Sequence, residues 1–261
     1  MTRLLVMVAS AVVFLAMFAH IMASGAMFKP RLSSYKLETE AKGEGELPVQ
    51  IVELGSGGKI ATYHKVVRPE ALTVVYFHGN AEDIGDSMAI LSTLQLRGFN
   101  VATMDYRGYG LSEGEASERN VYADAGAFLD FLIEDKGVEE SKIVVMGRSL
   151  GGAPAIKLAS DYEVAGLIVE SSFKSIYSLL IPIQFVPGDK FRNASKISDV
   201  NCPTLIIHGE KDRVVPVEHG RELAARSGAT KLETLWLEDA GHNDVALVGG
   251  AAYRGTIRKI L

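Results

Sequence analysis

Cysteine is nearly absent from this chain, and neither sign of charge dominates it. Cys202 is the single cysteine among 261 residues, so an internal disulfide and a cysteine-rich zinc site are both excluded. The 27 basic and 32 acidic residues leave a formal net charge of −5, and no cluster of Lys and Arg is interleaved with aromatic residues. The charge balance therefore argues against a nucleic-acid partner. In addition, no pair of histidines has the HExxH spacing of a helical zinc site.

A long uncharged run occupies the N-terminus. Residues 4–23 carry no formal charge and are interrupted by Ser10 and His20 alone. A helix of that length spans roughly 30 Å, which is enough to cross a bilayer. We therefore expect residues 1–27 to form a single-pass membrane anchor, with its side of the membrane left open. A cleaved signal peptide is the alternative, since residues 23–26 are small, and cleavage would make the protein secreted or periplasmic.

The rest of the chain divides into a polar linker at residues 28–48 and one folded domain at residues 49–261, a length sufficient for a large α/β core. Apolar, strand-like runs alternate there with amphipathic helical patterns. This alternation predicts an α/β fold with a mainly parallel central sheet and helices on both faces. The expected strands are 49–54, 59–67, 72–77, 99–104, 143–146, 164–169, 204–207 and 232–237, and the expected helices are 84–94, 121–132, 153–160 and 217–225.

A Gly-x-Ser-x-Gly motif directly follows the strand-like run at residues 143–146 and precedes a helical segment. This context predicts a nucleophile elbow, a strained turn from strand to helix that exposes Ser149. Gly147 and Gly151 leave no side chains to clash in such a turn. The backbone N–H of Leu150, at the helix start, can then face a developing oxyanion.

A serine hydroxyl needs a base to take its proton, and an imidazole base needs a carboxylate to fix its tautomer. Two later strands end in loops that carry such groups: Asp212 follows the run at 204–207, and His242 follows the run at 232–237. We therefore expect Ser149, His242 and Asp212 to form a catalytic triad. Glu170 stays open as an alternative acid, because it ends the strand after the elbow.

The chain resembles an α/β-hydrolase of the membrane-anchored, esterase- or lipase-like kind over residues 72–242. The resemblance rests on FHGNA at 77–81, DYRGYGLS at 105–112, the elbow, and the acid and histidine loops. It implies that the backbone N–H of Asn80, or alternatively of Ala81, completes the oxyanion hole with that of Leu150. It also assigns residues 105–108 a structural role at the floor of the site.

The resemblance implies a serine hydrolase that cleaves carboxylic esters or thioesters of acyl or lipid-like substrates through an acyl-enzyme, with no metal or organic cofactor. A serine peptidase with the same triad is the alternative, and a non-catalytic binding protein on this fold is a further one. Residues 171–200 lie where such enzymes insert a lid. Their apolar residues fit either a small cap over an acyl pocket or ordinary packing on the core.

Overall fold

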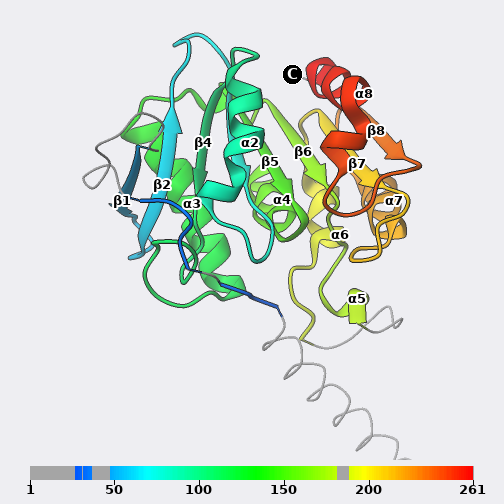
Figure 1. Cartoon of the computed structure of the whole chain (residues 1–261), viewed down its shortest axis with the longest axis horizontal. Helices are drawn as coiled ribbons and strands as arrows, with labels where there is room; N and C mark the ends of the chain where they lie inside the picture. The colour runs from blue at the N-terminus through cyan, green and yellow to red at the C-terminus, as the bar shows by residue number, and fades with distance from the viewer. Residues whose placement is uncertain (1–26, 31, 37–47, 181–187, 261) are drawn as a thin grey trace, which may run out of the picture.

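Short runs of β-branched and other apolar residues form an eight-stranded sheet at the centre of the protein (Figure 1). The computed structural model describes residues 27–30, 32–36, 48–180 and 188–260. The strands lie in the order β1-β2-β4-β3-β5-β6-β7-β8, and each strand expected from the sequence is present, with ends shifted by no more than two residues. Their bounds are β1 Val49–Glu53, β2 Lys59–Lys65, β3 Thr73–Phe77, β4 Asn100–Met104, β5 Ile143–Arg148, β6 Gly166–Glu170, β7 Thr204–Gly209 and β8 Leu232–Leu237.

The sheet is parallel from β4 through β3 to β8, and antiparallel where β1 pairs with β2 and β2 pairs with β4. Every residue of β3, β4, β6 and β7 is buried. Such complete burial is characteristic of parallel strands whose two faces are both covered by helices. The expected fold class, α/β with a mainly parallel sheet, is therefore confirmed.

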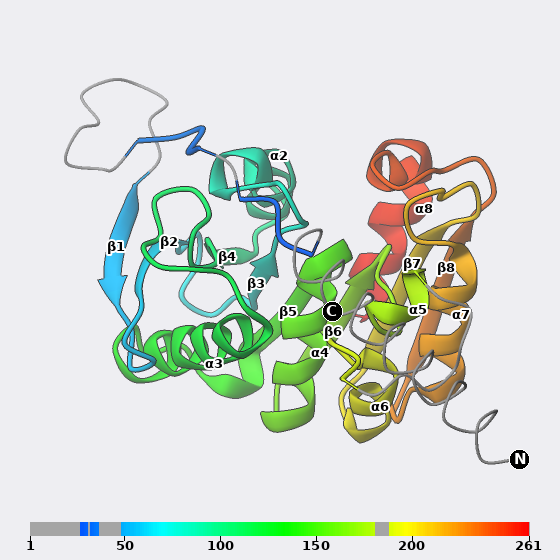
Figure 2. The same ribbon diagram turned by 90° about the horizontal axis from the view of Figure 1, so that it is seen from below.

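Helices cover both faces of this sheet (Figures 1 and 2). Val74 and Tyr76 of β3 share a core with α2 and α8, whereas Val75 and Phe77 of the same strand share the opposite core with α3 and α4. This division follows from the alternation of side chains along a strand. The helices are α2 Ile84–Gln95, α3 Glu118–Glu134, α4 Gly152–Asp161, α5 Tyr177–Leu180, α6 Asn193–Lys196, α7 Val217–Arg226 and α8 Val245–Ile260, with 3-10 turns at Glu140–Lys142, Ser149–Gly151 and Ile197–Asp199.

The C-terminal helix α8 is absent from the expectations drawn from the sequence. Its buried residues Val245, Tyr253 and Ile257 have helical spacing, but Gly250 adopts a non-helical φ of 44° that kinks the helix. Adjacent glycines weaken a helical pattern in sequence because each costs about 1 kcal/mol relative to alanine. The helix packs on β7 and β8 and brings Tyr253 to the carboxyl end of β6.

The carboxyl ends of the parallel strands meet at one edge of the sheet, which is where open α/β sheets place their ligand sites. The turn after β3 carries Asn80, β5 leads into Ser149, and the loops after β7 and β8 carry Asp212 and His242. The fold thus gathers the expected site residues from segments far apart in sequence.

The described residues 27–30 and 32–36, here called the N-terminal strap, lie along this same edge, although Met27 belongs to the expected anchor segment and the others to the expected linker. The backbone N–H and hydroxyl of Ser34 both donate to the Asp83 carboxylate at 2.6 Å, and the Tyr35 hydroxyl donates to Asp105. Both of these aspartates are fully buried. The strap therefore supplies hydrogen-bond donors to two buried carboxylates at this edge of the sheet.

No helix in the described part of the chain is both long and apolar enough to span a bilayer. The expected anchor at residues 4–23 lies outside the described residues, as do positions 181–187 of the expected lid. The anchor stays a prediction.

Candidate active site

Ser149 lies at a sharp turn between β5 and α4. Its φ of 53° falls in the left-handed region, which costs a residue with a side chain roughly 1–3 kcal/mol. A Cβ on Gly147 would lie 2.0 Å from the carbonyl oxygen of Gly151, and a Cβ on Gly151 would lie 2.0 Å from that of Phe77. Only glycine fits at either position, so the turn has the nucleophile-elbow geometry that the motif predicts.

Ser149, His242 and Asp212 lie in one chain of hydrogen bonds. His242 Nε2 is 3.1 Å from Ser149 Oγ, and His242 Nδ1 is 2.6 Å from Asp212 Oδ2. The second carboxylate oxygen, Oδ1, accepts from the backbone N–H groups of Val214 and Val215 at 2.8 Å each. Because both of its oxygens are held, the carboxylate can fix the orientation of the imidazole. The arrangement is able to move a proton from the serine hydroxyl to His242.

Asp212 is surrounded by donors that keep it ionised. Burial raises its pKa, but hydrogen bonds from His208, His242 and the backbone of Val215 outweigh this effect and hold the pKa well below its usual range. His208 is fully buried, with Nε2 3.4 Å from Asp212 Oδ2 and 2.8 Å from the carbonyl oxygen of Val215. No pattern in the sequence points to His208 as a partner of the acid. Its place at the end of β7, four residues before the acid, is the signal that could have found it.

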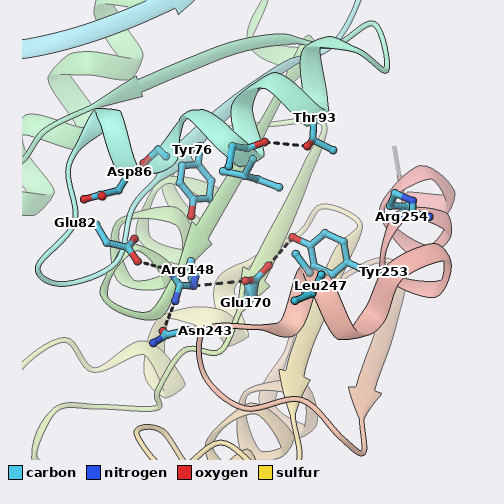
Figure 3. A pocket seen from close by; sticks show the side chains of 14 residues that line it. Tyr76, Glu82, Asp86, Thr93, Arg148, Glu170, Asn243, Leu247, Tyr253 and Arg254 are labelled. Atoms are coloured by element: carbon cyan, nitrogen blue, oxygen red, sulfur yellow. Dashed lines mark hydrogen bonds and ion pairs between the residues drawn. The ribbon is translucent and has the colours of Figure 1, made fainter. Parts of the chain in front are cut away.

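Glu170, the alternative acid, lies in a second group of polar residues with Arg148 and Tyr253 (Figure 3). Its Oε2 accepts from the Tyr253 hydroxyl at 2.6 Å, and its Oε1 lies 3.6 Å from Arg148 Nε. Burial raises the pKa of Glu170, against the opposing effects of the Tyr253 hydrogen bond and the Arg148 charge. His242 accordingly has Asp212, not Glu170, as its hydrogen-bonded carboxylate.

Asn80 and Leu150, the expected oxyanion donors, line the same cavity as Ser149. The turn that carries Asn80 is also held by Glu82, whose carboxylate accepts from the backbone N–H of Gly79 at 2.8 Å. Ala81, the alternative donor, has a φ of 63°, so the chain reverses sharply directly after Asn80. The two expected donors are thus brought together with the serine.

The N-terminal strap holds the side chain of Asn80 through its own backbone. Asn80 Oδ1 accepts from the N–H of Lys29 at 2.8 Å and from the Tyr109 hydroxyl at 2.6 Å, and Asn80 Nδ2 donates to the carbonyl oxygen of Met27 at 3.0 Å. Every polar atom of the carboxamide therefore has a partner. The turn at residues 78–81 is here called the oxyanion turn, after its expected role. The sequence does not predict that the strap contacts this turn, because a polar segment without periodicity is typical of a linker.

The cavity beside Ser149 is small and mainly apolar. Its volume is 220 Å3, and Phe173, Ile176 and Leu179 of the expected lid region form part of its wall. Phe173 and Ile176 are also buried in the core, so these residues pack on the domain and form part of the cavity wall. The described residues that line it are Met27, Lys29, Asn80, Ser149, Leu150, Phe173, Ile176, Leu179, Val214 and Val215.

The other described histidines lie apart from this cavity. His78 is fully buried, with Nε2 3.3 Å from Asp105, and His219 Nδ1 accepts from the backbone N–H of Lys174 at 3.3 Å. Among the residues that the structure describes, no group of His, Cys, Asp and Glu side chains is arranged to hold a metal ion.

The fold, together with this elbow and its histidine and aspartate partners, defines an α/β-hydrolase. A family model described as serine aminopeptidase, S33, matches residues 68–186. The α/β-hydrolase domain-containing protein aho-3 of Caenorhabditis elegans is 38% identical over 192 residues, which cover 72% of this chain and 57% of that protein. The human α/β-hydrolase domain-containing protein 17B is 37% identical over 197 residues, which cover 74% of this chain and 68% of that protein.

Solved structures agree with this relationship at the level of the fold. The Pyrococcus furiosus esterase Pf2001 has a TM-score of 0.71 at 19% identity, covering 90% of this chain and 98% of its own. The mouse α/β-hydrolase domain-containing protein 10 has a TM-score of 0.61 at 16% identity, covering 82% of this chain and 99% of its own. The relatives that share 37–38% identity with the chain, rather than these structures, show that it belongs to the α/β-hydrolase domain-containing proteins.

Proposed function

We propose that this protein is a serine hydrolase that cleaves carboxylic esters or thioesters with an apolar acyl part. The observation that carries the proposal is the hydrogen-bonded chain from Ser149 through His242 to Asp212, set beside an apolar cavity. Membership of the α/β-hydrolase family supports the hydrolase class, and the geometry supports serine as its nucleophile.

In the first half of the proposed reaction, His242 Nε2 takes the proton of Ser149 while Oγ bonds to the substrate's carbonyl carbon. The carbonyl oxygen becomes an oxyanion held by the backbone N–H groups of Leu150 and Asn80, each such donor contributing about 3 kcal/mol to the transition state. Asp212 keeps the Nδ1 proton in place and stabilises the imidazolium. The bond to the leaving group then breaks, and the alcohol or thiol departs with the proton from His242.

In the second half, water replaces the leaving group. His242 takes a proton from water as its oxygen bonds to the acyl carbon, and the bond from that carbon to Ser149 Oγ breaks. The proton returns to Ser149, and the carboxylic acid is released. The chain supplies every group that these steps use.

The cavity favours an acyl group over the amino terminus of a peptide, the substrate end that an aminopeptidase must bind. Of the described residues that line it, Lys29 is the one with a charged side chain, and none is a carboxylate. An α-ammonium needs an acceptor or a negative charge and is disfavoured beside a cation. At 220 Å3 the cavity is below the ~300–1,000 Å3 of pockets that enclose drug-sized ligands, so it suits a short acyl group or the carbonyl end of a longer one.

The expected membrane segment at residues 4–23 fits the same proposal, because an anchor would concentrate the enzyme at a lipid surface where acyl substrates collect.

A substrate panel with a matched inactive variant tests the proposed activity. The full-length protein should hydrolyse p-nitrophenyl esters and acyl thioesters faster than aminoacyl p-nitroanilides, and a fluorophosphonate probe should label it. Ser149→Ala should lose both hydrolysis and labelling while keeping its circular dichroism spectrum. Ester hydrolysis that survives Ser149→Ala would rule out the mechanism, and faster cleavage of the anilides would assign a peptidase.

A further inference from the structure

Arg148, the residue directly before the nucleophile, lies at the centre of a polar cluster outside the proposed mechanism (Figure 3). Its Nη1 pairs with Glu82, its Nε lies 3.6 Å from Glu170 Oε1, and its Nη2 donates to Asn243 Oδ1 at 2.5 Å. Nη2 also lies 3.4 Å from the carbonyl oxygen of His242. The three nitrogens of one guanidinium group thus contact three separate segments of the chain.

Two of these partners, Glu82 and Asn243, are next to parts of the proposed active site. Glu82 accepts, through its other oxygen, the N–H of Gly79 in the oxyanion turn. Asn243 directly follows His242, while Arg148 itself precedes Ser149. One planar group therefore links the oxyanion turn, the elbow and the histidine loop. A guanidinium group suits this role because its donors form a rigid fork, whereas the single ammonium of a lysine is a point charge.

Glu170 gives the cluster a fixed base. It is 7% exposed, lies at the end of β6 and is held by Tyr253 of α8. The guanidinium group is thereby held to the central sheet as well as to the oxyanion turn, the elbow and the histidine loop. Movement of any one of these three segments would therefore disturb the other two.

We infer that Arg148 is a positioning residue that sets the relative placement of the oxyanion turn, Ser149 and His242 during hydrolysis. The inference rests on the proposed function of the same site. A buried ion pair could instead serve stability alone, because removing one partner leaves the other charge without compensation. The two roles differ in what they predict: a positioning role lowers kcat in protein that is fully folded, whereas a stability role lowers the melting temperature alone.

A cavity beside Arg148 makes a direct test possible. This cavity of 380 Å3 lies between α2 and α8, is lined by Arg148, Glu82 and Glu170, and is separate in its lining from the cavity at Ser149. Truncation by Arg148→Ala would leave a vacant site that opens into it. A guanidinium ion added to the solution can enter from that side and occupy the place of the missing group.

The experiment measures kcat and KM for a p-nitrophenyl ester in full-length wild type and Arg148→Ala. We expect kcat to fall by about 10²-fold, the effect of a misplacement near 1 Å, with KM nearly unchanged. Millimolar guanidinium chloride should restore kcat by at least tenfold in the variant and not in the wild type, whereas urea of equal concentration should not. Arg148→Lys should remain close to Arg148→Ala, since one ammonium cannot reach all three partners.

Arg107→Ala is the matched control, because Arg107 is 18% exposed, against 16% for Arg148, and also pairs with a buried carboxylate, Asp124. It should lower the melting temperature while lowering kcat far less than Arg148→Ala does. Asn243→Ala offers a milder variant that removes only the contact between Arg148 and the Asn243 side chain, and its kcat should fall by up to about tenfold.

A kcat for Arg148→Ala close to that of wild type, rescue by urea as strong as by guanidinium, or an equal loss in Arg107→Ala would each overturn the positioning role. A wrong proposed function gives a different result from a wrong positioning role. In that case the wild type itself would hydrolyse the ester no faster than Ser149→Ala.

Discussion

Asp212→Asn should lower kcat/KM by about 10⁴-fold while the fold stays intact. Asp212 Oδ1 accepts from the backbone N–H groups of Val214 and Val215, and Oδ2 faces His242 Nδ1. In the asparagine variant the carboxamide oxygen has to stay on the two backbone donors, so the NH2 group turns to the histidine. Nδ1 must then act as an acceptor, the ring proton moves to Nε2, and the imidazole can no longer take the proton of Ser149.

Glu170→Gln is the matched control for this substitution, because it neutralises a second buried carboxylate at the same edge of the sheet. Its loss should stay below about tenfold, since the tautomer of His242 is unchanged. The assay is ester hydrolysis at pH 7 with circular dichroism and thermal melts on both variants. A larger loss in Glu170→Gln than in Asp212→Asn would refute the reasoning and move the acid role to Glu170.

Three further predictions concern the strap, the pH dependence and the N-terminal run. Lys29→Pro removes the N–H that binds Asn80 and should lower kcat about tenfold, short of the ~10²–10³-fold loss of an oxyanion donor itself, whereas Lys29→Ala keeps the N–H and should match wild type. Burial and the Lys174 charge lower the pKa of His219 from 6.5 to about 4. The unfolded chain therefore takes up a proton before the folded one, so the free energy of unfolding should fall by on the order of 2 kcal/mol between pH 6.5 and 4, and His219→Gln should flatten that slope in urea titrations. An uncleaved anchor at residues 4–23 should keep the protein in membranes after a carbonate wash, and intact-mass analysis showing a mature N-terminus shortly after this run would contradict it.

The sequence predicted the sheet and the elbow because each rests on a local pattern. A buried parallel strand is a continuous apolar run, and Gly-x-Ser-x-Gly records the close approach of Gly147 to Gly151 directly. The order of Ser149, Asp212 and His242 along the chain likewise follows from strands that end at one edge. These are properties that neighbouring residues determine among themselves.

Contacts between polar side chains of distant segments left no such pattern. Arg148 meets Glu82 and Asn243 across 66 and 95 positions of the chain, and nothing in the spacing of a lone arginine reveals its partners. The strap was missed for the same reason: Ser34 and Tyr35 look like linker residues until the buried aspartates that they satisfy are seen. Burial of the partner, rather than periodicity of the segment, determines these contacts.

The strap also has a practical consequence for how the protein can be handled. The backbone carbonyl of Met27 and the N–H of Lys29 bind Asn80, and both residues line the cavity beside Ser149. A new amino terminus created at Met27 would place an ammonium group on one of these contact residues and two residues before the other. Tags, fusion partners and protease sites introduced at the start of the domain would therefore act like substitutions in the proposed active site. A shortened protein should begin upstream of Met27 if its kinetics are to represent those of the whole chain.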